Sequence, residues 1–273
     1  MTQSTGRQDA SAPHVEALLE ARELSVGYGG PQGTTIISGL DFSVRAGEFV
    51  SIVGPSGVGK TTLLRTLSGL LEPTAGSLTF EGRPVIGPPD HLALVFQDYS
   101  RSLLPWATNG KNVELVLRRR GMAHSERRER AVSVLEAVGL NAAAAGKYPW
   151  ELSGGMQQRV SIARALAYEP RVLLMDEAFG SVDALTRVGL EDLVLRVRAQ
   201  FDMTVLLVTH DIDEAIYMSD RVIVLGGAPA SVIGSVDIPF EGDRDQFATK
   251  ALPVFAELRH EIYEHVQSGV PTR

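Results

Sequence analysis

The sequence predicts an α/β fold with a mostly parallel sheet, an antiparallel β layer and an inserted helical lobe. After residue 170, short apolar segments alternate with helical ones, which is typical of parallel strands joined by crossover helices. Before residue 54, the segments are short, β-like and separated by glycine-rich turns. Between these parts the composition becomes helical and rich in arginine. A chain of 273 residues can bury the core of one large domain or of two unequal lobes.

Each expected element follows from its own local pattern. Glycine-rich turns end the first strands, and Glu81-Gly82 marks the turn of a hairpin. A helix follows Gly59, where apolar residues recur at helical spacing, and another stops before Pro170. We expect strands at 18–28, 34–44, 48–54, 92–97, 171–177, 204–210 and 221–227, and helices at 59–71, 160–168, 184–200 and 253–266.

These patterns divide the chain into three parts. Residues 1–14 are polar and lack the apolar segment of a signal peptide, so we expect a disordered tail. One domain spans 15–250 and contains the helical lobe at about 98–155, and 251–273 form a C-terminal helix and tail. No apolar stretch approaches the roughly 20 residues that cross a bilayer. In a membrane process, another chain would therefore supply the membrane part.

The composition limits the classes of partner and site. The formal net charge is −7, which gives no global positive field for nucleic acid, and we expect no nucleic-acid partner. The chain contains no cysteine. This absence excludes a disulfide framework, a thiolate nucleophile and a cysteine-ligated metal site.

A complete phosphate-binding loop lies between an expected strand and an expected helix, in the pattern G-x-x-x-x-G-K-[ST]. Its glycines let backbone N–H groups converge on phosphate oxygens, and the helix N-terminus adds its positive dipole end. Lys60 should reach the β- and γ-phosphates of a bound nucleotide, and the Thr61 hydroxyl should bind Mg²⁺. The expected nucleotide-binding residues are Gly54, Ser56, Gly57, Gly59, Lys60, Thr61 and Thr62.

Two further patterns lie downstream. Asp176 and Glu177 end an apolar strand, and in P-loop ATPases a strand-end aspartate holds the Mg²⁺ shell. Without the phosphate loop, the pair could equally be an exposed acidic strand end. Ser153 precedes a helical pattern as an N-cap, and Gly154 and Gly155 leave the backbone open to an anion. Taken alone, this second pattern would be an ordinary helix start.

Together, the phosphate loop, the run Leu152-Ser153-Gly154-Gly155-Met156 and the two carboxylates resemble the ATP-binding subunits of ABC transporters over roughly 18–225. The resemblance implies a P-loop ATPase core. It implies that Glu177 orients or deprotonates the attacking water. It also implies that Ser153, Gly154 and Gly155 bind the γ-phosphate held by a second subunit. Two identical chains would then pack head to tail, and one chain could not complete its own site.

The resemblance assigns roles to four more residues. Gln97 matches the Q-loop and would contact Mg²⁺ or the lytic water. His210 matches the switch histidine near the γ-phosphate, and Asp183 matches the D-loop at the dimer seam. Tyr28 matches the aromatic residue that stacks on adenine, although tyrosine is also common in edge strands.

The segments around Trp106 and Asp183 resemble the importer branch for nitrate, sulfonates and taurine. Around Asp183 the sequence departs slightly from the pattern of the ABC family, because Val182 stands where leucine is usual and Ala178 where proline is frequent, but both changes are apolar and small. Trp106 either packs inside the helical lobe or grips a helix of a permease. The arginines at 118–120, 127, 128 and 130 form either a solvated helical face or a surface for permease loops or anionic lipids.

The expected function is therefore ATP hydrolysis that powers the import of a small anionic or polar solute. The catalytic residues would be Glu177, His210 and Gln97, and the Mg²⁺ ligands would be Thr61, Gln97 and Asp176. The partners would be a second copy, an integral-membrane permease and a solute-binding protein, with the chain peripheral on the cytoplasmic face. The alternatives are a soluble ABC ATPase that remodels protein or nucleic acid, and a nucleotide-regulated scaffold without turnover.

Overall fold

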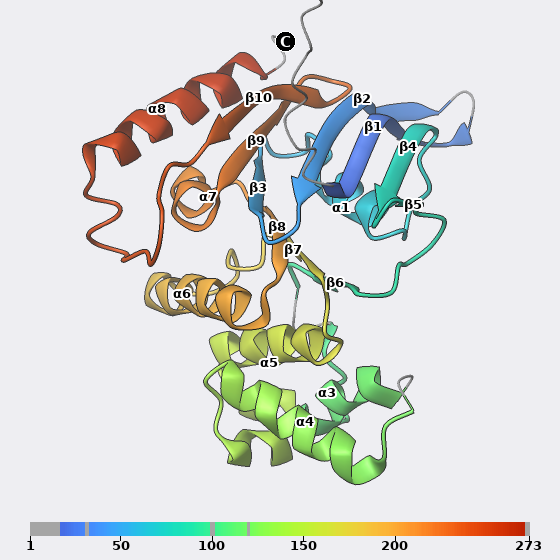
Figure 1. Ribbon diagram of the computed structural model, residues 1–273, viewed down its shortest axis with the longest axis vertical. Coiled ribbons are helices and arrows are strands. Elements are labelled where there is room, and N and C mark those ends of the chain that lie inside the picture. The colour runs from blue at the N-terminus through green and yellow to red at the C-terminus, as the bar shows by residue number, and fades with distance from the viewer. Residues whose placement is uncertain (1–16, 31–32, 99–101, 119–120, 271–273) are drawn as a thin grey trace, which may run out of the picture.

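A computed structural model describes residues 17–30, 33–98, 102–118 and 121–270 of the protein. This part of the chain forms two sheets, a helical lobe, a C-terminal helix and further helices that pack on the sheets (Figure 1). The tail expected at 1–14 and two of the arginines, at 119 and 120, lie outside the described residues.

The central sheet has six strands in the order β10-β9-β3-β8-β7-β6. Its strands from β9 to β6 are parallel, as the alternation of strands and helices predicted, and β10 is antiparallel to β9. The bounds are β3 (Phe49–Val53), β6 (Leu92–Val95), β7 (Val172–Asp176), β8 (Thr204–Val208), β9 (Arg221–Gly226) and β10 (Ser231–Asp237). Strand β10 was not predicted, because most of its residues are partly exposed and its sequence forms no apolar run.

Both faces of this sheet are covered by apolar residues. Every residue of β3, β7 and β8 is buried, which is typical of central parallel strands. Successive residues face opposite sides, so Leu173 and Met175 join one apolar cluster while Val172 and Leu174 join the other.

A second, antiparallel sheet has the strand order β2-β1-β4-β5. Its strands are β1 (Ala17–Tyr28), β2 (Thr34–Arg45), β4 (Ala75–Phe80) and β5 (Arg83–Pro84). The predicted hairpin joins β4 to β5, with positive φ at Glu81 (52°) and Gly82 (69°), the conformation that a tight hairpin turn requires. The inner side chains of this sheet share one apolar cluster with helix α1 (Lys60–Leu67), which follows the phosphate loop.

Among the described residues, the lobe at the lower end of Figure 1 contains the helices α3 (Asn109–Leu117), α4 (His124–Ala137) and α5 (Gly154–Ala167). Two short 3₁₀ segments lie between α4 and α5, at Ala142–Gly146 and Pro149–Glu151. Helix α5 packs against both α3 and α4, so the helical layer continues beyond the expected limit at 155. The division of the chain into domains stays a prediction.

The exposure of Trp106 decides between the two roles that its sequence context allowed. Trp106 is 75% exposed, so it does not pack inside the lobe. Two of the clustered arginines make specific contacts, because Arg127 donates to the Met122 carbonyl and Arg130 pairs with Glu169 at 3.1 Å.

Helices α6 (Ala184–Phe201), α7 (Ile212–Met218) and α8 (Pro253–Ser268) complete the fold. The predicted C-terminal helix is present as α8, which contacts α7, β9 and β10 through its buried face of Phe255, Leu258 and Ile262. Among the described residues, no helix combines the length and the apolarity that a bilayer crossing requires.

Candidate nucleotide-binding site

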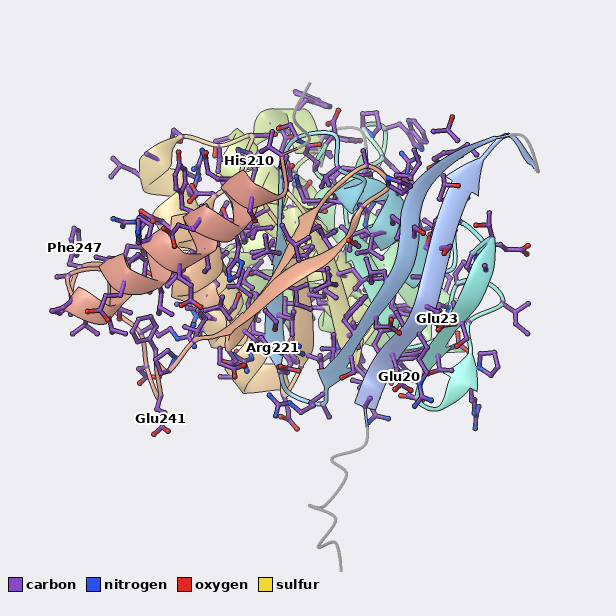
Figure 2. The ribbon with its side chains drawn as sticks, turned by 90° about the horizontal axis from the view of Figure 1, so that it is seen from above. Glu20, Glu23, His210, Arg221, Glu241 and Phe247 are labelled. Carbon is purple, nitrogen blue, oxygen red and sulfur yellow. The ribbon has the colours of Figure 1, made fainter. Side chains whose placement is uncertain are left out.

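The expected site residues follow four neighbouring parallel strands. The phosphate loop follows β3, Gln97 follows β6, Glu177 follows β7 and His210 follows β8. Because carboxyl ends of parallel strands meet at one edge of a sheet, these segments converge there. Figure 2 shows His210 at the end of the molecule opposite to Arg221, where β9 begins.

The phosphate loop has the backbone that its glycines allow. Gly57 (φ 80°) and Gly59 (φ 109°) lie in the left-handed region, and a Cβ on Gly59 would lie 2.7 Å from Cγ2 of Ile36. Lys60 begins α1 with its side chain buried, and its Nζ donates to the carbonyls of Gly54 (2.9 Å) and Pro55 (3.2 Å). Burial lowers the pKa of Lys60, and the carboxylates of Glu177 and Asp176 oppose this shift.

Thr61 and Asp176 form a pair of hard oxygen donors beside the loop. The Thr61 hydroxyl donates to Oδ1 of Asp176 at 3.3 Å. Burial raises the pKa of Asp176, and the Thr61 hydrogen bond opposes it. Both residues and Gln97 line a pocket of about 390 Å³.

This donor set suits Mg²⁺, which commonly takes one or two protein carboxylates and completes its shell with phosphate oxygens and water. Among the described residues, no group of three or more His, Cys, Asp or Glu side chains is arranged so that it could hold a metal ion by itself. These protein donors therefore suit a metal ion that a bound nucleotide would help to coordinate.

The three expected catalytic residues meet at one atom. Oε2 of Glu177 accepts a hydrogen bond from Nε2 of Gln97 at 3.1 Å and lies 3.2 Å from Nδ1 of His210. Glu177 itself has a positive φ of 43°, and its backbone N–H donates to the Val208 carbonyl. This contact fixes the residue at the end of β7, directly beside β8.

Tyr28 ends β1 near the same loop. Its hydroxyl lies 3.4 Å from Oγ1 of Thr62, and the side chain is 44% exposed. An exposed ring beside the start of α1 is compatible with adenine stacking, which stays a prediction.

A second group of expected residues lies where α5 and α6 begin. Ser153 caps α5 by accepting the Met156 N–H, and Asp183 caps α6 by accepting the Thr186 N–H. The Thr186 hydroxyl also donates to Asp183 at 2.6 Å, and these bonds lower the pKa of Asp183. A Cβ on Gly155 would lie 2.2 Å from Cγ2 of Thr186. Gly155 is thus needed for helix packing, a constraint that the local sequence did not indicate.

The two groups are separate within one chain. Across the described residues, no hydrogen bond or ion pair joins Ser153, Gly154, Gly155 or Asp183 to the phosphate loop or to Glu177. No such bond therefore links the two groups within one chain, and their union in one site across two chains stays a prediction.

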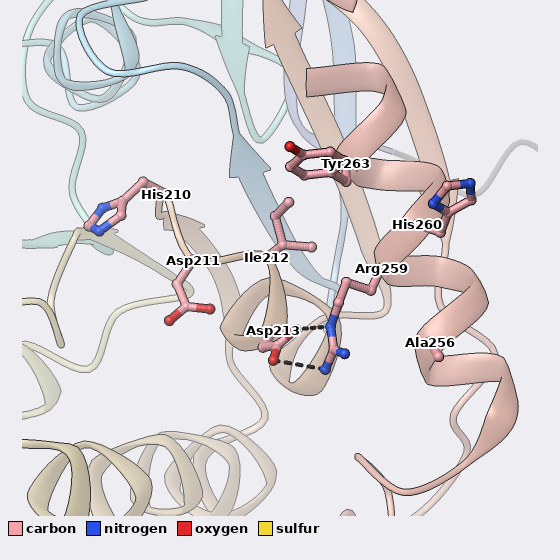
Figure 3. A pocket seen from close by; sticks show the side chains of 8 residues that line it. All are labelled: His210, Asp211, Ile212, Asp213, Ala256, Arg259, His260 and Tyr263. Carbon is pink, nitrogen blue, oxygen red and sulfur yellow. Dashed lines mark hydrogen bonds and ion pairs between the residues drawn. The ribbon is translucent and has the colours of Figure 1, made fainter. Parts of the chain in front are cut away.

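Sequence reasoning also missed a pocket of about 560 Å³ beside His210 (Figure 3). It forms where α8 meets the start of α7, and Asp211, Asp213, Arg259 and Tyr263 are among its lining residues. No local pattern could indicate it, because its two walls are more than 40 residues apart in the chain.

Comparisons with known proteins agree on one family. A family model described as "ABC transporter" matches residues 37–180. The nitrate import ATP-binding protein NrtD of Synechococcus elongatus is 43% identical over 238 residues, which are 86% of each chain. The taurine import ATP-binding protein TauB of Chromobacterium violaceum is 42% identical over 255 residues, 92% of this chain and 96% of that protein.

Two further matches differ in extent. The nitrate import ATP-binding protein NrtC of Synechococcus elongatus is 43% identical over 233 residues, and the match spans 84% of this chain but only 35% of NrtC. Among solved structures, an ATP-binding cassette in a dimeric post-hydrolysis state bound to ADP and Pi has a TM-score of 0.72 and 32% identity. That match covers 82% of this chain and all of the cassette.

The contact between α5 and α6 gives a first prediction. Gly155→Ala should lower the free energy of unfolding. Overpacking against Thr186 costs about 1–3 kcal/mol, which exceeds the gain of about 1 kcal/mol that alanine brings to a helix. Adding Thr186→Ser removes the clashing methyl but keeps the hydroxyl bond to Asp183, so the double variant should regain most of the loss. Denaturant titration followed by circular dichroism measures both, with Thr186→Ser alone as the control. A Gly155→Ala protein as stable as the parent would contradict the close contact.

Proposed function

We propose, from the premise that this chain belongs to the ABC transporter family, that it is the ATP-hydrolysing subunit of a solute importer. The observation that carries the proposal is the meeting of Gln97 and His210 on the carboxylate of Glu177, beside the Thr61–Asp176 pair. A scaffold without turnover would not need these three catalytic groups at one point.

Each group has a distinct part in the reaction. Lys60 and the loop N–H groups bind the phosphates of ATP, and Thr61, Asp176 and Gln97 would hold Mg²⁺, which neutralises charge on the phosphates. Glu177 orients the attacking water and accepts its proton, while His210 and Gln97 fix the orientation of the Glu177 carboxylate. Catalysis is thus positioning combined with electrostatic stabilisation.

The active site is shared by two copies of the chain. The separation of Ser153 and Asp183 from the phosphate loop supports a head-to-tail homodimer, in which each copy offers its α5 N-terminus to the γ-phosphate on the other. A helix N-terminus that carries unpaired N–H groups and a capping serine suits such an anion.

The relatives support an importer. The nitrate and taurine import proteins match almost the full length of this chain, and small anionic or polar solutes of that type are the proposed cargo. An integral-membrane permease and a solute-binding protein complete the assembly, and the chain lies peripherally on the cytoplasmic face. A soluble ABC ATPase that acts on protein or nucleic acid is the alternative.

Glu177 provides the second prediction. Glu177→Gln should leave ATP affinity nearly intact and lower turnover about a hundredfold or more, because the general base is lost. An ATP-stabilised dimer should accumulate. Phosphate release and size-exclusion chromatography measure the two effects. Lys60→Ala is the contrasting variant, since it should weaken binding of a fluorescent ATP analogue. Near-normal hydrolysis by Glu177→Gln would remove Glu177 from the reaction.

A mixing experiment tests the shared site. Lys60→Ala and Ser153→Arg chains should each be inactive alone. A head-to-tail heterodimer of the two contains one site with both defects and one with neither, so mixing should restore part of the activity. Native mass spectrometry is the control that shows whether heterodimers form. If they form without any recovery, each chain hydrolyses ATP by itself.

Trp106 separates the importer from a soluble ATPase. Its 75% exposure makes it available to a permease helix, and aromatic side chains are frequent interface anchors. Trp106→Ala should keep basal ATPase activity but lower permease binding by about 2 kcal/mol or more, together with transport in reconstituted vesicles. Phe247→Ala is a matched control, because Phe247 is 85% exposed and lies outside the lobe. Full transport by Trp106→Ala would exclude Trp106 from the interface.

A further inference from the structure

The loop that carries His210 is fixed by the residue that follows it. Asp211 accepts the backbone N–H of Glu214 on Oδ1 at 3.1 Å and so caps α7, and its own N–H donates to Oγ1 of Thr209. The position of His210 therefore depends on where Asp211 is held.

Two arginines, one on α6 and one on α8, bind acidic residues at the start of α7. Arg187, on α6, donates from Nη1 to Oδ2 of Asp211 at 3.3 Å. Arg259, on α8, donates from Nε and Nη2 to both oxygens of Asp213, at 2.5 and 2.9 Å. Figure 3 shows the carboxylate of Asp211 directed away from the Arg259–Asp213 pair. The two arginines thus act on different acids of the same turn.

Arg187 is poorly placed to stabilise the fold. Its bridge is a single hydrogen bond between side chains that are 32% and 35% exposed, and such pairs contribute about 0–1 kcal/mol. Its Nε is buried without a hydrogen-bond partner in the described part of the chain. A buried donor left unpaired costs free energy and calls for a reason other than stability.

The nearby acid on α7 does not replace Asp211 as the partner of Arg187. Glu214 is buried, and one of its carboxyl oxygens, Oε1, also has no hydrogen-bond partner among the described residues. Burial raises the pKa of Glu214 to about 8, a shift that Arg187 opposes and that Glu191 and Asp211 increase. In the described part of the chain, Arg187 is hydrogen-bonded to Asp211 and not to Glu214.

We propose that Arg187 is a positioning residue for His210. It holds Asp211, and through it the backbone at 209–211, so that Nδ1 of His210 stays at the Glu177 carboxylate. Arg187 lies one turn after Asp183, to whose carbonyl its backbone N–H donates at 2.9 Å. The inference rests on the proposed function, because it assumes that His210 and Glu177 act in ATP hydrolysis.

Steady-state ATPase kinetics test this role. Arg187→Ala should lower kcat about tenfold, since small displacements of catalytic groups cost large factors in rate. The KM for ATP and the affinity for a fluorescent ATP analogue should stay within about twofold of the parent, because the phosphate loop and Tyr28 are untouched. Arg187→Lys retains the charge and should recover part of kcat.

Matched variants distinguish positioning from stability. Arg259→Ala breaks the stronger bridge to the same turn without acting on Asp211, and its kcat should stay within about twofold of the parent. Asp211→Asn keeps a good helix cap but removes the charge that Arg187 holds, so it should lower kcat to a similar extent. The kcat of the Arg187→Ala/Asp211→Asn double variant should be no lower than that of either single variant.

The outcomes separate this inference from the proposed function. A parent protein without ATPase activity would contradict the proposed function. With an active parent, three results would overturn the proposed role of Arg187 and leave the proposed function standing. These are an unchanged kcat in Arg187→Ala, an equal loss of kcat in Arg259→Ala, and a double variant whose loss of kcat is the product of the two single losses. If Arg187→Ala does not fold, which its analogue affinity reveals, Arg187→Lys and Asp211→Asn carry the same comparison.

Discussion

The parallel pairing of β3, β8, β7 and β6 is the constraint on which the site depends. Asp176 pairs with Val208 in the sheet, so the next residues, Glu177 and Thr209, leave the sheet side by side. Asp176 faces the same side as Val172 and Leu174, the side that α1 covers, and there it meets Thr61. A register slip of one residue would turn the side chain of Asp176 to the other face and separate it from Thr61.

The first turn of α6 is the structural link between the two groups of site residues. Thr186 contacts Gly155 at the start of α5 and donates to Asp183. One residue later, Arg187 reaches Asp211 beside His210. The residues that the proposed dimer would place against a second copy are therefore connected to the chain's own proposed catalytic residues through a single helical turn.

Local sequence patterns predicted most of the fold and the half of the site that follows β3 and β7. Buried strands such as β7 and β8 are continuous apolar runs, and the phosphate loop, Asp176 and Glu177 follow directly from them. The half-exposed strand β10 has no such run and escaped prediction. The packing role of Gly155 and the Arg187–Asp211 bridge escaped for another reason, since both depend on contacts between segments that are distant in the chain, 24 residues apart for the bridge. Charged residues at that separation carry no signal of pairing in one sequence.

The carboxylate of Glu177 divides two tasks between its oxygens. Gln97 and His210 both contact Oε2, so this oxygen fixes the orientation of the group. In the proposed reaction, Oε1 is the oxygen that would face the attacking water and take its proton. Orientation through Oε2 requires that His210 stay at its distance of 3.2 Å, and His210 is a largely exposed side chain on a loop. Support for the proposed base, Glu177, must therefore come from the backbone on either side of His210, where Thr209 is bonded to Asp211 and Asp211 to Arg187.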